Sequence, residues 1–187
     1  PARRSGRMDL NYRELEYNYR SARRIVRFGN LEQAMRAALF SIPDLRPQTP
    51  WLTEPREFPV VAFRNRDAQF WNRFRENAGW IVIVPCADGE ELRYVQDDPV
   101  LRERILVEDG VPQNVLSPSR AKGCEYADVV VYGFGGSMEK PVLDVLRDSD
   151  HEPDGEGRLP LEYFINRLYV AVSRAKRRLV IVDSDAG

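Results

Sequence analysis

The residues of this chain best suited to chemistry are arginines beside the expected ends of helices and strands. Arg174 lies in YVAVSRAK at residues 169–176, which ends an expected helix and leads into the expected strand Leu179–Val182. Its permanently charged, forked guanidinium suits a phosphate group at the mouth of a sheet. The window also fits a simpler interpretation, in which Arg174, Arg177 and Arg178 answer the dipole of the last helical turn.

A second arginine precedes another expected helix. Arg20 lies in LEYNYRS at residues 15–21, and Ser21 is a suitable N-cap for the helix that follows. An anion could bind there through Arg20 and the free backbone N–H groups, although an exposed arginine beside a cap also explains the pattern. Gly29 and Asn30 are expected to break or bend this helix. Its apolar positions at helical spacing are Ile25, Val26, Leu31, Met35, Ala38 and Leu39.

The loop at residues 117–126, with the sequence SPSRAKGCEY, feeds a strongly apolar strand. Lys122 and Gly123 would let the backbone come close to a ligand, and Glu125 could accept hydrogen bonds from sugar hydroxyls. A surface turn closed by a Lys122–Glu125 salt bridge fits the same spacing. Ligands of open α/β sheets sit at the carboxyl ends of strands, and this loop is of that type.

The elements that must position these residues alternate between strands and helices. A helix over residues 67–78 connects two apolar strands, which indicates a β-α-β unit with a right-handed crossover. A last helix begins with Pro160 at its first position and precedes the final strand. The pattern predicts one doubly wound α/β domain with a mostly parallel sheet covered by helices. The expected strands are 60–63, 80–84, 115–117, 128–132 and 179–182, and the stripe of the last helix is Leu161, Phe164, Ile165, Leu168 and Val172.

The connecting segments are rich in proline, glycine or charge and predict little regular structure. Five prolines lie within residues 42–59, which are expected to be a loop that Trp51 and Leu52 pin to the body. The remaining expectations are a short strand at 92–95, a short helix at 100–106, and a helical turn at 141–147 within a long acidic connection.

Length, composition and charge describe a soluble globular protein. The chain has 187 residues, of which 43% are apolar and 30% charged, and its net charge is −1. It contains no apolar run of about 18 residues, and its Arg-rich start lacks the apolar stretch of a secretory signal. Cys86, Cys124 and His151 have no metal-site spacing, so we expect no metal site and a reducing, cytoplasmic compartment.

Together, the three windows resemble motifs of the second RecA-like domain of superfamily 1 helicases of the UvrD/Rep/PcrA type. Residues 15–21 are similar to motif IV, residues 117–130 to motif V, and residues 168–176 to motif VI, in the correct order. The resemblance covers nearly all of residues 10–183 and leaves residues 1–9 as a lead-in. It implies a RecA-like (P-loop NTPase-like) α/β fold, with the family's accessory insertion absent or reduced to about residues 85–113.

The resemblance also implies roles for particular residues. Arg174 would be the arginine finger and Arg20 a second arginine on the γ-phosphate of ATP, both acting across an interdomain cleft. Glu125 would face the ribose. The implied nucleotide-binding residues are Glu125, Gly123, Lys122 and Tyr19, and the implied DNA-binding residues are Ser117, Ser119 and Arg120.

The chain departs from the family pattern at several of these positions. Ser119 stands where the family commonly has His, and Ser173 replaces the usual Thr. Cys124-Glu125-Tyr126 stands where Leu-Glu-Phe is usual. The change at Ser119 affects one expected DNA contact and leaves the expected fold intact.

The sequence lacks the other half of such a motor. It contains no Gly-x-x-x-x-Gly-Lys-Ser/Thr stretch, and no acidic strand end is an evident Mg²⁺ site. The family keeps both in its first RecA-like domain, so we expect this chain to be part of a longer ATP-dependent DNA helicase and inactive alone. ATP, Mg²⁺, single-stranded DNA and the first RecA-like domain would be its cofactors and partners. Two alternatives stay open: a RecA-like module that has lost catalysis and binds protein or nucleic acid, and a motor that acts on RNA or works with a nuclease in repair or defence.

Overall fold

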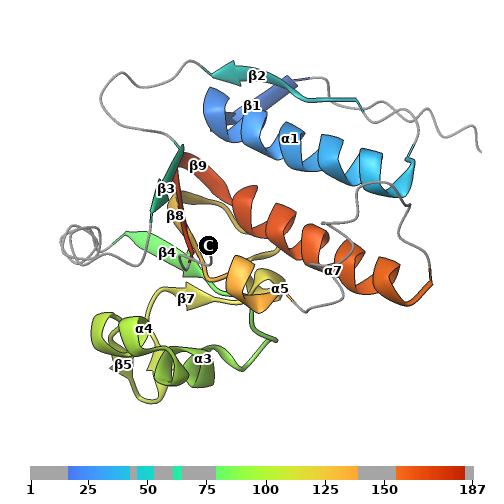
Figure 1. Ribbon diagram of the computed structural model, residues 1–187. Coiled ribbons are helices and arrows are strands. Elements are labelled where there is room, and N and C mark those ends of the chain that lie inside the picture. Colours follow the sequence, from blue (N-terminus) through green and yellow to red (C-terminus); the bar gives the residue numbers. More distant parts are fainter. Residues whose placement is uncertain (1–16, 43–45, 53–60, 65–78, 139–154, 184–187) are drawn as a thin grey trace, which may run out of the picture.

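A parallel five-stranded sheet forms the centre of the protein (Figure 1). The computed structural model describes residues 17–42, 46–52, 61–64, 79–138 and 155–183. All strand pairs of the sheet are parallel, and the strand order is β3-β9-β8-β4-β7. The strands are β3 Val61–Arg64, β4 Trp80–Ile83, β7 Val115–Leu116, β8 Tyr126–Tyr132 and β9 Ala175–Val182.

The central strand β8 and the second half of its neighbour β9, Leu179–Val182, are largely apolar because the sheet is covered on both faces. Val129, Val130 and Val131 follow one another in β8 and are all fully buried. Alternate residues belong to different cores: Val130 packs with the lobe of α3 and α4, whereas Val129 and Val131 pack under α1 and α7. The expected α/β class, parallel sheet and helical cover are therefore confirmed.

The helical layer over one face consists of α1 Arg23–Phe40 and α7 Gly155–Val172. The end of α1 lies against the start of α7, where Phe40 packs with Leu161 and Ile165. This confirms the predicted buried stripe of the last helix. Pro160 was predicted at its first position but lies inside α7, which begins at Gly155.

Three expectations about α1 are wrong. Leu31 and Met35 of its predicted apolar stripe are exposed, whereas Glu32 is buried. Ser21 does not cap the helix, since it belongs to strand β1 Tyr17–Ala22 and its hydroxyl donates to the backbone oxygen of Ala175 (2.9 Å). The helix also continues through Gly29 and Asn30. The side-chain amide of Asn30 donates to the Gln48 carbonyl and accepts from the Gln48 backbone N–H. The polar side chain of Asn30 is therefore satisfied without breaking the helix.

The proline-rich segment was predicted to be a loop, yet it contains strand β2 Thr49–Leu52, which pairs in parallel with β1. Hydrogen bonds from distant side chains, rather than the strand propensity of its own residues, hold β2 in place. The amide of Asn18 donates to the side chain of Gln48, just before β2, while Asn30 holds the Gln48 backbone. Because β1 is the only described strand that pairs with β2, Pro50 is tolerated at this edge.

The strands flanking the predicted helix at 67–78 are both present, but they are not neighbours. β9 and β8 lie between β3 and β4 in the sheet. Residues 67–78, the predicted turn at 141–147 and His151 lie outside the described residues.

A small lobe follows β4 and covers the second face of the sheet. The strand predicted at residues 92–95 is wrong, because this segment lies in helix α3 Glu91–Asp97, where Val95 is buried. The predicted short helix is α4 Pro99–Arg104, whose first N–H groups are bonded by Asp98. A hairpin of β5 Val107–Glu108 and β6 Val111–Pro112, the single turn α5 Pro118–Ala121 and the 3₁₀ turn η1 Gly135–Ser137 complete the described elements.

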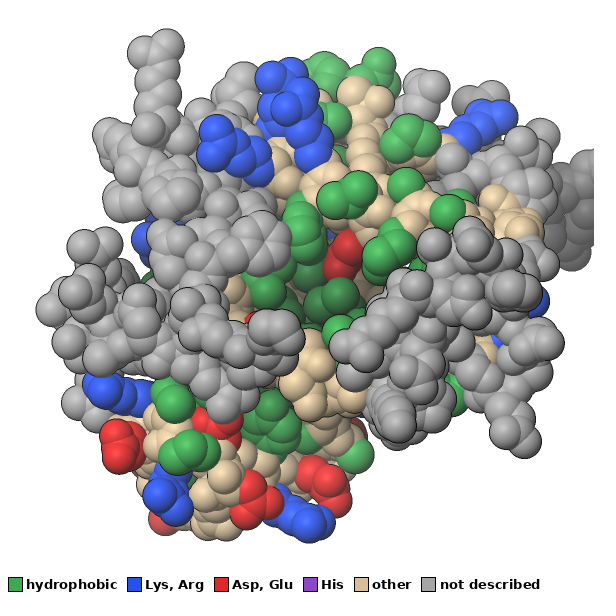
Figure 2. Space-filling view, viewed as in Figure 1, with side chains coloured by type: hydrophobic (Ala, Val, Ile, Leu, Met, Phe, Trp, Pro, Cys, Tyr) green, Lys and Arg blue, Asp and Glu red, His purple; other side chains and the backbone are tan. Residues whose placement is uncertain are grey.

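The surface charge differs between the two ends of the molecule (Figure 2). Acidic and basic side chains mix over the lobe of α3 and α4, while Lys and Arg side chains stand out over the end that carries α1. Among the described helices, none is long and apolar enough to cross a membrane.

Candidate functional site

The structure brings Arg20 and Arg174 together at the amino ends of β8 and β9. Arg20 comes from β1, and Arg174 from the turn between α7 and β9. Both contact Ser173: Arg20 Nη2 donates to its backbone oxygen (3.4 Å) and Arg174 Nη2 to its Oγ (3.0 Å). Two cations that are 154 positions apart in the chain thus share one small region.

Strand β1 is fixed against the main sheet by short polar contacts. The side-chain oxygen of Asn18 accepts from the backbone N–H groups of Arg20 and Ser21, at 3.0 and 2.9 Å. The buried hydroxyl of Ser21 then donates to the Ala175 carbonyl. Asn18 and Ser21 therefore hold the backbone on either side of Arg20, which limits where its side chain can reach.

Glu125 joins the two sides of this region. Its Oε1 accepts from Arg20 Nη1 at 2.9 Å, and its Oε2 lies 3.7 Å from Lys176 Nζ. The hydrogen bond from Arg20, with further help from Lys176, holds the pKa of Glu125 below its usual range. The alternative Lys122–Glu125 pair is not what closes this turn, since Glu125 bonds to β1 and β9 instead.

Arg174 is bound to its own chain through three nitrogens. Nε donates to the Val170 carbonyl and Nη1 to the Cys124 carbonyl, both at 3.1 Å, besides the contact with Ser173. Burial lowers the pKa of Arg174, and the charge of Arg20 lowers it further. The two guanidiniums are thus close enough to repel, and an anion between them would relieve that repulsion.

Arg177 and Arg178 have a different partner from the one expected. Both guanidiniums bind the buried carboxylate of Asp128 on β8, Arg178 through Nε at 2.7 Å and Nη2 at 2.8 Å. Burial alone would raise the pKa of Asp128, but the two arginines more than offset it and hold the pKa below its usual range. The helix-dipole interpretation is therefore wrong for these two residues. Arg178 also lies over the Trp80 ring, 4.6 Å from its centroid.

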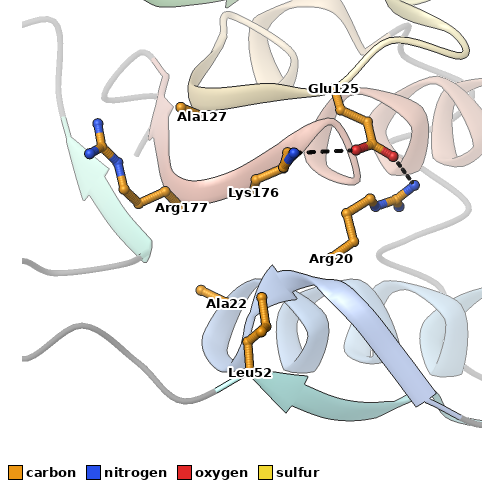
Figure 3. A pocket seen from close by; sticks show the side chains of 7 residues that line it. All are labelled: Arg20, Ala22, Leu52, Glu125, Ala127, Lys176 and Arg177. Carbon is orange, nitrogen blue, oxygen red and sulfur yellow. Dashed lines mark hydrogen bonds and ion pairs between the residues drawn. The ribbon is translucent and has the colours of Figure 1, made fainter.

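A pocket of about 370 Å³ opens beside these residues (Figure 3). Its apolar part comes from Ala22, Leu52 and Ala127, and its charged part from Arg20, Glu125, Lys176 and Arg177. Figure 3 shows the heads of Arg20 and Lys176 turned toward Glu125, while the head of Arg177 points away.

The loop at 117–126 does not lie at one edge of the sheet. Ser117 follows the carboxyl end of β7, whereas Glu125 precedes the amino end of β8. Parallel strands place these ends at opposite edges, so the expectation that the whole loop is a carboxyl-end loop is wrong for Glu125. Gly123 makes the connecting turn with φ of +83°, a conformation that suits glycine. Lys122 is exposed at this turn.

The expected DNA-binding residues lie at the carboxyl edge and differ in exposure. Ser117 is fully buried and its Oγ accepts from the Arg120 N–H, so its side chain is not placed to touch a strand directly. Ser119 and Arg120 are exposed. Arg120 is 3.8 Å from the carboxylates of both Asp88 and Glu91, and the buried Glu91 also accepts from the Ser117 N–H.

Tyr19 lies on the face of β1 opposite Arg20, because side chains alternate along a strand. It is 55% exposed and forms an aromatic group with Tyr17 and Trp51, whose ring lies 5.1 Å from that of Tyr19. Trp51 was expected to pin its loop to the body, and its place on this exposed surface was not predicted. The roles of Lys176 and Asp128 as charge partners were not predicted either. Only the basic run ending the YVAVSRAK stretch could have indicated Lys176.

Within the described ranges, no three His, Cys, Asp or Glu side chains gather in a way that could hold a metal ion. Both cysteines are free; Cys86 is buried and Cys124 is exposed beside Glu125. No protein-family model matches the chain, and no curated protein matches it significantly.

Proposed function

We propose that this chain is the second RecA-like domain of a superfamily 1 helicase of the UvrD/Rep/PcrA type. It would supply Arg174 and Arg20 to an ATP site shared with another domain. The observation that carries the proposal is the convergence of these two arginines on Ser173 at the amino edge of the sheet. Charge that develops on a transferring phosphoryl group is stabilised most by such preorganised cations.

The site could accept a γ-phosphate without rebuilding the fold. A guanidinium has five N–H donors, and the described contacts of Arg174 use three nitrogens with one donor each. Val170, Cys124 and Ser173 would therefore hold the side chain while further donors face a phosphate. The described residues contain no group of three His, Cys, Asp or Glu side chains that could hold a metal ion, so the ligands of Mg²⁺ would come from the other domain.

The loop at 117–126 offers a route from nucleotide to nucleic acid. Its start, with Ser119 and Arg120 exposed, would form part of the single-strand track at the carboxyl edge. Its end carries Glu125, which contacts Arg20. A change at the nucleotide would pass through the Gly123 turn to α5, and repeated closure of the cleft would step the domains along a strand.

One observation favours a second candidate, a RecA-like module that binds nucleic acid or protein without catalysis. Arg174 makes three hydrogen bonds within the chain and Arg20 pairs with Glu125, so both arginines could have a purely structural role. A motor on RNA would use the same groups, because single strands are gripped by backbone charge and stacking.

The test is ATP hydrolysis by this chain combined with a nucleotide-binding RecA-like domain, with and without single-stranded DNA or RNA. We expect stimulated turnover that falls about 10³-fold or more in Arg174→Ala. Arg174→Lys keeps the charge but loses the fork, so it should also be slow. Arg93→Ala, on the exposed surface of α3, is the matched control and should leave turnover unchanged. If Arg174→Ala does not change turnover, or if no turnover is seen, the motor proposal is refuted and the binding module without catalysis is favoured.

A further inference from the structure

Lys176 is a charged residue of the pocket to which the proposed ATP site assigns no role. It lies at the start of β9, two residues after Arg174, and its ammonium is directed toward Glu125 (Figure 3). Its side chain is 48% exposed, and its distance to Glu125 Oε2 is 3.7 Å. A pair of this length and exposure is held loosely, so Lys176 can exchange one anion for another at little cost.

The charges at this end of the pocket do not balance. Arg20 and Lys176 face the single carboxylate of Glu125, which leaves one positive charge in excess among these three groups. Arg177 is left out of this count because its guanidinium points away from Glu125 and shares the Asp128 carboxylate with Arg178. A phosphate group carries up to two charges and three acceptor oxygens, so it would satisfy Arg20 and Lys176 better than one carboxylate does.

Glu125 has the properties of an internal counter-ion that can leave. Its side chain is 36% exposed, so its carboxylate could be hydrated when it swings away from the two cations. In the described part of the chain, its carboxylate is held by the two cations themselves, Arg20 and Lys176, while its backbone is placed between the Gly123 turn and β8. The apolar floor of Ala22, Leu52 and Ala127 offers no competing partner.

We propose that Arg20 and Lys176 form a phosphate-binding site separate from Arg174, in which Glu125 is the resident counter-ion that the phosphate displaces. This site shares Arg20 with the proposed ATP site, but its test does not depend on the proposed function, because binding is measured on the chain itself and without hydrolysis. A nucleotide and the backbone of a nucleic acid carry the same phosphate chemistry, and the test distinguishes between them.

The experiment is titration calorimetry of the chain with tripolyphosphate at low salt. We expect Lys176→Ala to weaken binding roughly tenfold, since one charge-assisted contact is lost. Glu125→Gln should tighten binding between about twofold and tenfold, because the competing charge is removed while the shape is kept. Both side chains are substantially exposed, so both variants should fold.

Asp97→Asn is the matched control for Glu125→Gln. It adds the same unit of positive charge on exposed α3, in the lobe that packs under the sheet, and should change affinity less than about twofold. ATP and an oligothymidylate are then compared as ligands. If Lys176→Ala weakens the binding of one of them, that result supports the site and shows whether the phosphate comes from a nucleotide or from a nucleic-acid backbone.

Three results would overturn the proposal. In the first, Glu125→Gln weakens tripolyphosphate binding, which would make Glu125 a positioning residue for the cations. In the second, Lys176→Ala binds as the wild type does. In the third, Arg174→Ala abolishes binding that Lys176→Ala leaves intact, which would place the anion at Arg174.

Discussion

Glu32 gives the sharpest prediction about stability. It lies on the buried side of α1, four residues after Phe28 and seven after Ile25, where an apolar side chain would be expected. Only 5% of the residue is exposed, and neither carboxyl oxygen has a hydrogen-bond partner in the part of the chain that the structure describes. Burial raises the pKa of Glu32 from 4.5 to about 8.

The raised pKa of Glu32 determines whether stability rises or falls with pH. A carboxyl group whose pKa is higher in the folded state than in the unfolded state binds more protons when folded. Its contribution to stability is complete below about pH 4.5 and is lost as the pH rises to about 8. The free energy of unfolding should fall by about 1.4 kcal/mol per pH unit within that window, or roughly 5 kcal/mol across it.

The perturbation is Glu32→Gln, which keeps the shape but removes the ionisation. We expect the difference in unfolding free energy, variant minus wild type, to grow by about 1.4 kcal/mol per pH unit, or about 3 kcal/mol between pH 5.5 and 7.5. Urea titrations followed by tryptophan fluorescence at several pH values measure it. Because all other groups cancel in the difference, the slope reports Glu32 alone.

Asp97→Asn, on the surface of α3, controls for the general effect of losing one negative charge. A difference between Glu32→Gln and wild type that stays constant from pH 5.5 to 7.5 would refute the reasoning. So would a difference that shrinks as the pH rises, since this would mean that the folded protein prefers the charged carboxylate.

Two further predictions concern the sheet. Asp128→Asn removes the carboxylate that both arginines of β9 share, and should cost about 2 to 4 kcal/mol of unfolding free energy in urea titrations; a cost below about 0.5 kcal/mol would show that the arginines are hydrated instead. Gly133→Ala should destabilise the fold by about 1 to 3 kcal/mol, because φ is +71° and the new Cβ would lie 2.5 Å from Tyr94 Oη. Tyr94→Phe in the same background should recover the part due to the clash, and full recovery would mean that backbone strain is negligible.

The two proposals share Arg20, but each has its own test. Loss of DNA-stimulated hydrolysis in Arg174→Ala tests the motor, whereas tripolyphosphate binding to Lys176 and Glu125 variants tests the pocket. A chain that binds phosphate through Lys176 but supports no hydrolysis would keep the second proposal and discard the first.

Local sequence determined the elements whose signal is contained in their own residues. The apolar runs at 80–83, 128–132 and 179–182 could only be buried strands, and the Leu161–Val172 stripe could only be a helix packed on one side. The parallel α/β class followed from their alternation.

Tertiary structure decided everything that depends on distant partners. Ser21 fits an N-cap by type, but its hydroxyl is used by Ala175, and β2 exists because Asn18 and Asn30 bind Gln48. Leu31 and Met35 fit the buried face of α1 by type, yet both are exposed and Glu32 is buried instead. A helix rotates about its axis to suit the largest packed surface, and one polar residue is carried inside with it.

The candidate site shows the same division. The resemblance of three windows to helicase motifs implied that Arg20, Glu125 and Arg174 serve one nucleotide site. Strand order and direction alone decided that they meet at the amino edge of the sheet, that Lys176 joins them, and that Ser117 lies buried at the opposite edge. The position of a charge in space depends on which strands pair, and pairing is a property of the whole chain, which no single window contains.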